Sequence, residues 1–78
     1  MIRVKLCIYI DDCKAVFGEL YNKHYIVRNY KESWNGKDAT FYIDFLTETE
    51  MFRVISELNS KCRSGRGLVI LKKEALHG

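Results

Sequence analysis

Apolar and polar residues alternate at the start of the chain, from residue 2 to residue 10. A repeat of two places successive side chains on opposite faces of a β-strand, so this segment predicts a strand with one buried face. The expected buried set is Ile2, Val4, Leu6, Ile8 and Ile10, and the opposite set is Arg3, Lys5, Cys7 and Tyr9.

Two later stretches repeat apolar residues every three or four positions, which is the spacing of one face of an α-helix. The first follows the Asp11-Asp12 pair, which we expect to cap the helix N-terminus. The second begins at Thr47, which forms a capping-box pattern with Glu50, and stops near Gly65, a residue that favours a left-handed turn. The two apolar stripes are Cys13, Val16, Phe17, Leu20 and Tyr21, and Met51, Phe52, Ile55, Leu58 and Cys62.

Residues 25–46 hold two aromatic-rich, β-prone runs on either side of Asn35-Gly36, and this arrangement predicts a β-hairpin. The second run has one apolar set that should face the core, namely Phe41, Ile43 and Phe45. A two-residue loop would place Arg28 opposite Ile43. It would therefore bury an unpaired arginine charge, which is strongly unfavourable.

A loop with an odd number of residues avoids this burial, because a shift of one residue moves every side chain to the other face of the sheet. A three-residue loop at residues 35–37 places Arg28 beside Asp44. It also places Tyr30 beside Tyr42, with all four side chains on the outward face. We therefore expect an odd loop with a glycine bulge.

A last apolar run, residues 68–71, predicts a final strand, and residues 73–78 are expected to form a frayed tail. The elements then follow the order strand, helix, strand, strand, helix, strand. This order predicts one α+β domain over residues 1–78, a ferredoxin-like βαββαβ sandwich with a four-stranded antiparallel sheet and both helices on one face. Strands one and three should be central, and the other sheet face should be open to water or to a partner.

The expected open face combines aromatic rings with basic side chains. Such surfaces bind single-stranded nucleic acids, because bases stack on the rings and cations contact the phosphates. An interface with another protein or with a second copy of the chain is the alternative. The candidate binding residues are Arg3, Lys5, Tyr9, Arg28, Tyr30, Tyr42 and Asp44, and a candidate basic loop holds Lys61, Arg63 and Arg66.

Composition narrows the function classes. The formal net charge of +3 permits a polyanionic partner without requiring one. Three widely spaced cysteines favour a reducing cytoplasm over secretion, and the chain shows neither a membrane-spanning apolar run nor a leader pattern. The sequence has no metal-ligand spacing, nucleophile elbow or phosphate loop, so we expect a cytoplasmic protein that is not an enzyme and uses no cofactor.

Two short segments resemble the RNA-recognition motif. Ile8-Tyr9-Ile10 is similar to the signature on that family's first strand, and Tyr42-Ile43-Asp44-Phe45 is similar to the end of the signature on its third strand. The resemblance implies that Tyr9 and Tyr42 stack on bases. The order of strand, Asp11-Asp12, helix and hairpin also resembles ACT-type regulatory domains, which implies paired domains with a small effector between them.

These features rank the expected functions. A small regulatory or inhibitory protein comes first, acting through its open sheet face or a sheet edge on a protein partner or a second copy. Small inhibitors made by phages use this fold, which adds a viral role by analogy. A protein that binds single-stranded RNA or DNA comes second, and a dimer that senses a small effector is the remaining alternative. No membrane partner is expected.

Overall fold

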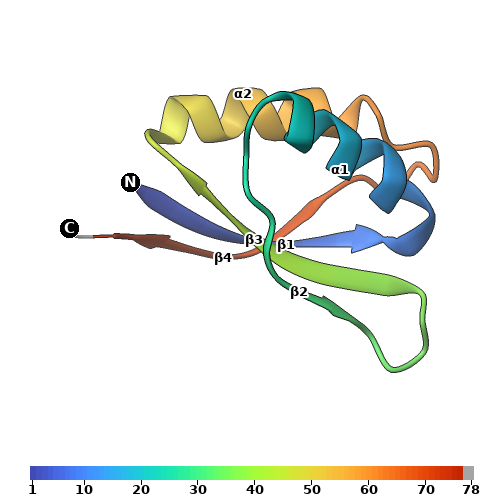
Figure 1. Ribbon diagram of the computed structural model, residues 1–78. Helices are drawn as coiled ribbons and strands as arrows, with labels where there is room; N and C mark the ends of the chain where they lie inside the picture. The colour runs from blue at the N-terminus through green and yellow to red at the C-terminus, as the bar shows by residue number, and fades with distance from the viewer. Residues whose placement is uncertain (77–78) are drawn as a thin grey trace.

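The computed structural model describes residues 1–76 of the chain. This part forms two helices and an antiparallel four-stranded sheet, and both helices cover the same face of the sheet (Figure 1). The arrangement is α+β and consistent with the ferredoxin-like class expected from the sequence. The elements are β1 (Ile2–Tyr9), a 3-10 turn η1 (Ile10–Asp12), α1 (Cys13–Asn22), β2 (Arg28–Glu32), β3 (Asp38–Phe45), α2 (Glu48–Asn59) and β4 (Val69–Ala75).

The strands lie in the order β2-β3-β1-β4, with β1 and β3 in the middle. The alternation in β1 has the predicted effect, because Val4, Leu6 and Ile8 are buried while the residues between them are only partly buried. β3 alternates in the same way and is in register with β1, so that Val4 pairs with Ile43. Both strands therefore present an apolar face to the helices and a polar face to the opposite side. The buried apolar core is Val4, Leu6, Ile8, Val16, Leu20, Ala39, Phe41, Ile43, Phe45, Met51, Val54, Ile55 and Leu58.

The turn between β2 and β3 differs from the prediction of an odd loop. The amide of Ser33 donates to the carbonyl of Asp38 at 2.8 Å, and Glu32 pairs with Ala39. The loop is therefore the even, four-residue segment 34–37. Near the turn, its register is the one that a two-residue Asn35-Gly36 loop would give.

A β-bulge inside β2 shifts the pairing with β3 by one residue. It therefore turns Arg28 to the open face even though the loop has an even number of residues. Lys31 pairs with Thr40 and Arg28 pairs with Tyr42, so Asn29 and Tyr30 together stand opposite Phe41. Asn29 has a φ of 53°, a left-handed conformation that asparagine tolerates better than most residues. Arg28 lies on the open face as expected, but opposite Tyr42 and not Asp44. The predicted pairing of Tyr30 with Tyr42 is wrong.

The helix ends agree with the prediction only in part. Thr47 caps α2, because its hydroxyl accepts the amide of Glu50 at 3.1 Å. Asp12 occupies the N-cap position of α1, as predicted, but its side chain makes no capping bond among the described residues. Gly65 is left-handed, with a φ of 82°, but α2 already ends at Asn59, and Gly65 shapes the loop that follows.

β4 is longer than its apolar run, because it continues through Ala75. The predicted frayed tail is therefore wrong for residues 73–75, while residues 77–78 lie outside the described part. A bulge shifts the pairing of β4 with β1 between Lys5 and Leu6.

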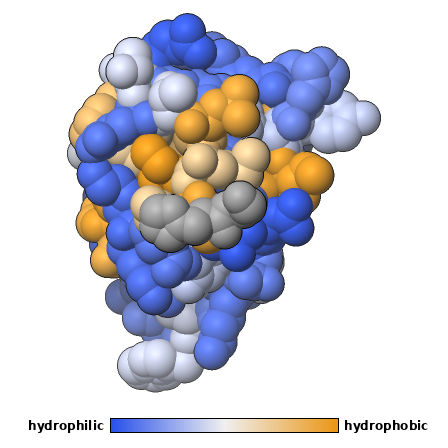
Figure 2. All heavy atoms as spheres, turned by 90° about the vertical axis from the view of Figure 1, so that its left-hand side faces the viewer, coloured by the Kyte–Doolittle hydropathy of each residue, from blue (hydrophilic) through white to orange (hydrophobic). Residues whose placement is uncertain are grey.

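Apolar residues gather on the side of the molecule where the two chain ends lie (Figure 2). Met1, Ile26 and Leu46 are exposed and line one shallow groove.

Candidate functional site

The open sheet face carries six of the seven candidate binding residues. The register pairs Arg3 with Asp44 and Lys5 with Tyr42, and it pairs Tyr9 with Asp38. These side chains point away from the buried set of β1 and β3. The six residues are Arg3, Lys5 and Tyr9 on β1, Arg28 on β2, and Tyr42 and Asp44 on β3.

Asp44 holds two arginines on this face. The Arg3 guanidinium donates to both carboxylate oxygens, with Nε to Oδ1 at 2.8 Å and Nη2 to Oδ2 at 3.1 Å. Arg28 approaches the same carboxylate, with Nε 3.6 Å from Oδ2. The hydrogen bond from Arg3 lowers the pKa of Asp44, and the pKa of Arg3 is raised in return. Two positive charges surround one negative charge, so this trio keeps a net positive charge.

A cation lies over each tyrosine ring of the open face. The Arg66 guanidinium carbon is 5.2 Å from the centre of the Tyr9 ring, and Lys5 Nζ is 5.9 Å from the centre of the Tyr42 ring. Arg66 Nη1 also lies 3.3 Å from Asp38 Oδ1. Cations within about 6 Å of a ring face are attracted to its electrons. Each ring therefore sits next to a positive charge that is able to contact a phosphate.

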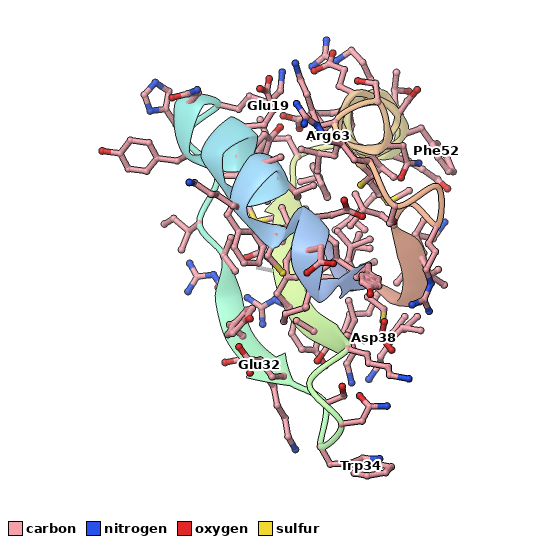
Figure 3. All side chains as sticks on the ribbon, turned by 90° about the vertical axis from the view of Figure 1, so that its right-hand side faces the viewer. Glu19, Glu32, Trp34, Asp38, Phe52 and Arg63 are labelled. Carbon is pink, nitrogen blue, oxygen red and sulfur yellow. The ribbon has the colours of Figure 1, made fainter. Side chains whose placement is uncertain are left out.

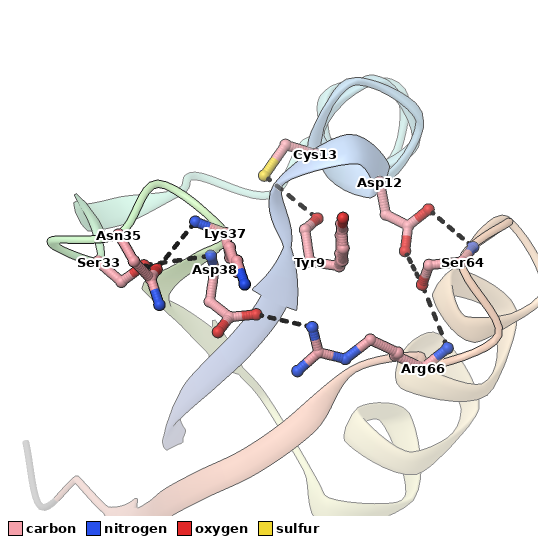
Figure 4. Close-up of polar contacts among 9 residues, drawn as sticks. All are labelled: Tyr9, Asp12, Cys13, Ser33, Asn35, Lys37, Asp38, Ser64 and Arg66. Atoms are coloured by element: carbon pink, nitrogen blue, oxygen red, sulfur yellow. Dashed lines mark hydrogen bonds and ion pairs between the residues drawn. The ribbon is translucent and has the colours of Figure 1, made fainter.

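A buried carboxylate brings Arg66 to Tyr9. Asp12 is only 3% exposed, and it accepts the amides of Arg63 at 2.9 Å and Ser64 at 3.3 Å, of which Figure 4 draws the second. It also accepts the Ser64 hydroxyl at 2.6 Å, and the amide of Arg66 donates to that hydroxyl oxygen at 3.1 Å. The bond from the Ser64 hydroxyl is the main cause of the lowered pKa of Asp12. Asp12 thus fixes the loop after α2 against the end of β1.

The predicted basic loop is divided by this anchor. Arg66 reaches the open face, as described above. Lys61 and Arg63 instead line a groove on the helix side together with Lys14 of α1. The three residues therefore do not form one basic cluster, and only Arg66 joins the candidate site.

Tyr30 is the candidate that the structure removes from the open face. Its ring packs edge-on against Phe17 of α1, with ring centres 5.6 Å apart, and its hydroxyl donates to Glu32. Partial burial raises the pKa of Tyr30 to about 12, and the bond to Glu32 adds to the shift. The bulge at Asn29 explains this placement, because it turns Tyr30 to the same face as Phe41.

Trp34 and Lys31 were not predicted as binding residues from the sequence. Trp34 lies at the tip of the hairpin and points away from the rest of the chain (Figure 3), with 97% of its surface exposed. Lys31 pairs with Thr40 and therefore belongs to the open face. The signal for Trp34 was present in the sequence, because a large aromatic residue directly precedes Asn35-Gly36.

The cysteines and the possible metal ligands do not form a reactive site among the described residues. Cys7, Cys13 and Cys62 are unpaired and half-buried, and burial raises the pKa of each thiol. A raised pKa leaves little of the reactive thiolate at neutral pH. Within residues 1–76, no three His, Cys, Asp or Glu side chains converge as metal ligands do.

Comparison of the chain with protein-family models, with curated proteins and with solved structures found no match. Neither helix in residues 1–76 is long and apolar enough to span a membrane. The candidate site is therefore defined by its geometry alone, as a polar sheet face with two tyrosines and an excess of cations.

Proposed function

We propose that the chain is a ferredoxin-like, non-enzymatic binding domain whose open sheet face binds single-stranded nucleic acid in the cytoplasm. The observation that carries the proposal is the pair of partly exposed rings, Tyr9 and Tyr42, each next to a cation on a sheet face that the helices leave open. Flat rings stack on bases of any sequence, and the neighbouring cations neutralise phosphates.

The charge of the face favours this partner over a protein. Among the described residues, six cations on the face meet three carboxylates, and a protein interface usually has few charges at its centre. The carboxylates are also occupied, because each lies within ion-pair distance of a cation. The cations are Arg3, Lys5, Arg28, Lys31, Arg66 and Lys72, and the carboxylates are Asp38, Asp44 and Glu74.

Binding of a labelled oligo(U) or oligo(dT), followed by fluorescence anisotropy, tests the proposal. We expect affinity to fall steeply between about 50 and 200 mM salt, because cations that contact phosphates release counterions. Tyr9→Ala and Tyr42→Ala should each weaken binding by about 1–3 kcal/mol, the usual contribution of one stacked base. Tyr21→Ala is the matched control, since Tyr21 is 80% exposed and belongs to α1, on the other side of the sheet. Absence of binding at low salt would contradict the proposal.

A regulatory protein that pairs with a second copy through β4 is the second candidate, and the exposed apolar residues of this edge strand favour it. Val69, Ile70 and Leu71 are all exposed, and Phe52 of α2 is exposed beside Lys73 of the same strand. An edge strand also offers unpaired backbone groups to another strand. Antiparallel pairing of two β4 strands would cover the apolar run in both copies.

Multi-angle light scattering over a range of concentrations tests this pairing. A dimer is expected, and Leu71→Lys should shift it to the monomer because it places a charge in the joint edge. Leu46→Lys is the control, since Leu46 is similarly exposed but lies away from β4, before α2. A wild-type protein that stays monomeric at high concentration would exclude self-pairing.

A further inference from the structure

We infer that Trp34 is a third stacking platform, so that a bound single strand continues from the sheet face onto the hairpin tip. This inference rests on the proposed function and extends the ligand from one that covers the sheet to a longer strand. It concerns a residue whose exposure the fold does not explain.

The hairpin turn is held without the indole. Ser33 and Asn35 form the turn, since the Ser33 hydroxyl donates to Asn35 Oδ1 at 2.6 Å and the amide of Lys37 donates to the same atom at 3.0 Å. The amide of Asp38 also donates to the Ser33 hydroxyl oxygen at 3.2 Å. No hydrogen bond or ring contact of Trp34 is found within residues 1–76. A polar residue at this position would satisfy the turn equally well, so the indole is available for a ligand.

The position of the tip continues the line of the two tyrosines. Lys5 pairs with Tyr42 and Tyr9 pairs with Asp38, so the tyrosines lie four residues apart along the paired strands. This separation is about 13 Å at about 3.3 Å per residue. The amide of Ile10, which follows Tyr9, donates to the carbonyl of Lys37 at 2.8 Å and joins the end of β1 to the base of the loop. Tyr42, Tyr9 and Trp34 therefore follow one another in the same direction.

The charges near the tip suit a phosphate backbone. Lys31 precedes the loop and Lys37 is its last residue, and neither has an ion-pair partner within the described part of the chain. The nearby carboxylates are engaged, because Glu32 accepts the Tyr30 hydroxyl and Asp38 lies against Arg66. The sheet face likewise combines cations with tyrosine rings, although there each cation lies directly over a ring. Because the turn is held by its own hydrogen bonds, little loop entropy is lost when a base stacks there.

The length of the strand separates this inference from the function on which it rests. Oligo(U) of about four nucleotides should occupy the sheet face, whereas one of about twelve should also reach the hairpin, within the range of site sizes known for such proteins. Trp34→Ala should weaken binding of the longer strand on the order of 5- to 100-fold and leave the shorter strand nearly unchanged. Trp34→Phe should restore most of the loss because it keeps a flat ring. Tyr21→Ala again serves as the exposed aromatic control.

The chain has one tryptophan, so its own fluorescence reports on the tip without a label. The longer strand should quench this emission on binding, and the same strand should show weaker quenching when Lys31 and Lys37 are both replaced by alanine.

Three outcomes would overturn the inference. In the first, the longer strand binds and depends on Tyr9 and Tyr42, but Trp34→Ala does not change its affinity and its binding does not change the Trp34 emission. The proposed function then stands without the inference. In the second, no oligonucleotide binds at low salt, and this result contradicts both the proposed function and the inference. In the third, the emission shifts to the blue with anionic phospholipid vesicles but not with oligonucleotides, which assigns Trp34 to a membrane surface.

Discussion

Replacement of Asp12 by alanine is expected to lower the free energy of unfolding by about 2–4 kcal/mol. The carboxylate is buried and accepts three hydrogen bonds from Arg63 and Ser64. Hydrogen bonds to a charged group contribute about 1.5–3 kcal/mol each, but water reaches part of this loop and replaces some of them. Because the loop carries Arg66, the variant should also bind oligonucleotides more weakly than its remaining folded fraction predicts.

Urea denaturation of the variant beside Asp11→Ala measures this effect. Asp11 is the adjacent acidic residue, and its side chain is exposed, so its removal should change stability by less than about 0.5 kcal/mol. Similar stabilities for the two variants would show that the loop is held by other contacts. Asp12→Asn should lie between the two, since an amide oxygen still accepts from the backbone but carries no charge.

The same carboxylate makes stability depend on pH. Its pKa in the folded protein lies below the ordinary value of 3.8, mainly because the Ser64 hydroxyl donates to it. A group of this kind stabilises the folded state above its unfolded pKa, and the contribution is lost as the pH falls through the folded pKa. Asp44 follows the same rule through Arg3. Stability should therefore drop below about pH 4, and the drop should be shallower in Asp12→Asn.

The hairpin shows how much of the register can be predicted from the sequence. Arg28 stays out of the core, as predicted, because an unpaired charge is too unfavourable there. The extra residue that turns Arg28 outward was expected in the loop. In the structure it lies within β2, at Asn29, and this position sends Tyr30 to the helix face. The sequence alone requires that the Arg28 charge stays out of the core. An extra residue in the loop or within β2 satisfies this requirement equally well, so the sequence does not decide between them.

Polar contacts between residues far apart in the chain could not be predicted from the sequence. The alternation of β1 and β3 follows from local spacing, and the structure has it. The predicted stripes of α1 and α2 are only partly correct, because Tyr21 and Phe52 are exposed and Val54 is buried instead. The contact between Asp12 and Ser64 joins residues more than fifty positions apart. An aspartate before a helix predicts a cap on local grounds, and only the packed fold shows that the loop after α2 occupies it instead. For the same reason, the sequence placed Arg66 in a basic loop and not over Tyr9.

The core beneath the candidate site belongs to a domain of low expected stability. A domain of 78 residues is expected to have a free energy of unfolding of about 4–12 kcal/mol. Phe41 lies at the centre of the core and is fully buried. Its ring packs edge-on against Phe17 at 5.0 Å, and Phe17 in turn contacts Tyr30 at the bulge. Phe41 therefore connects the central strand with α1 and, through Phe17, with the bulge that places Arg28.

Phe41→Ala should lower the free energy of unfolding by about 3–5 kcal/mol, because it removes a buried ring and leaves a cavity. In a domain of this size the change unfolds a large part of the molecules, so thermal denaturation followed by circular dichroism should show a melting temperature lower by more than about 10 °C. Phe52→Ala removes the same side chain from an exposed position on α2 and is the matched control, with an expected loss below about 1 kcal/mol. If the two variants melted together, the ring of Phe41 would not be the central contact of this core. If Phe41→Ala instead stayed folded but lost its affinity for oligonucleotides, the packing of Phe41 against Phe17 would matter mainly for the position of Arg28 on the open face.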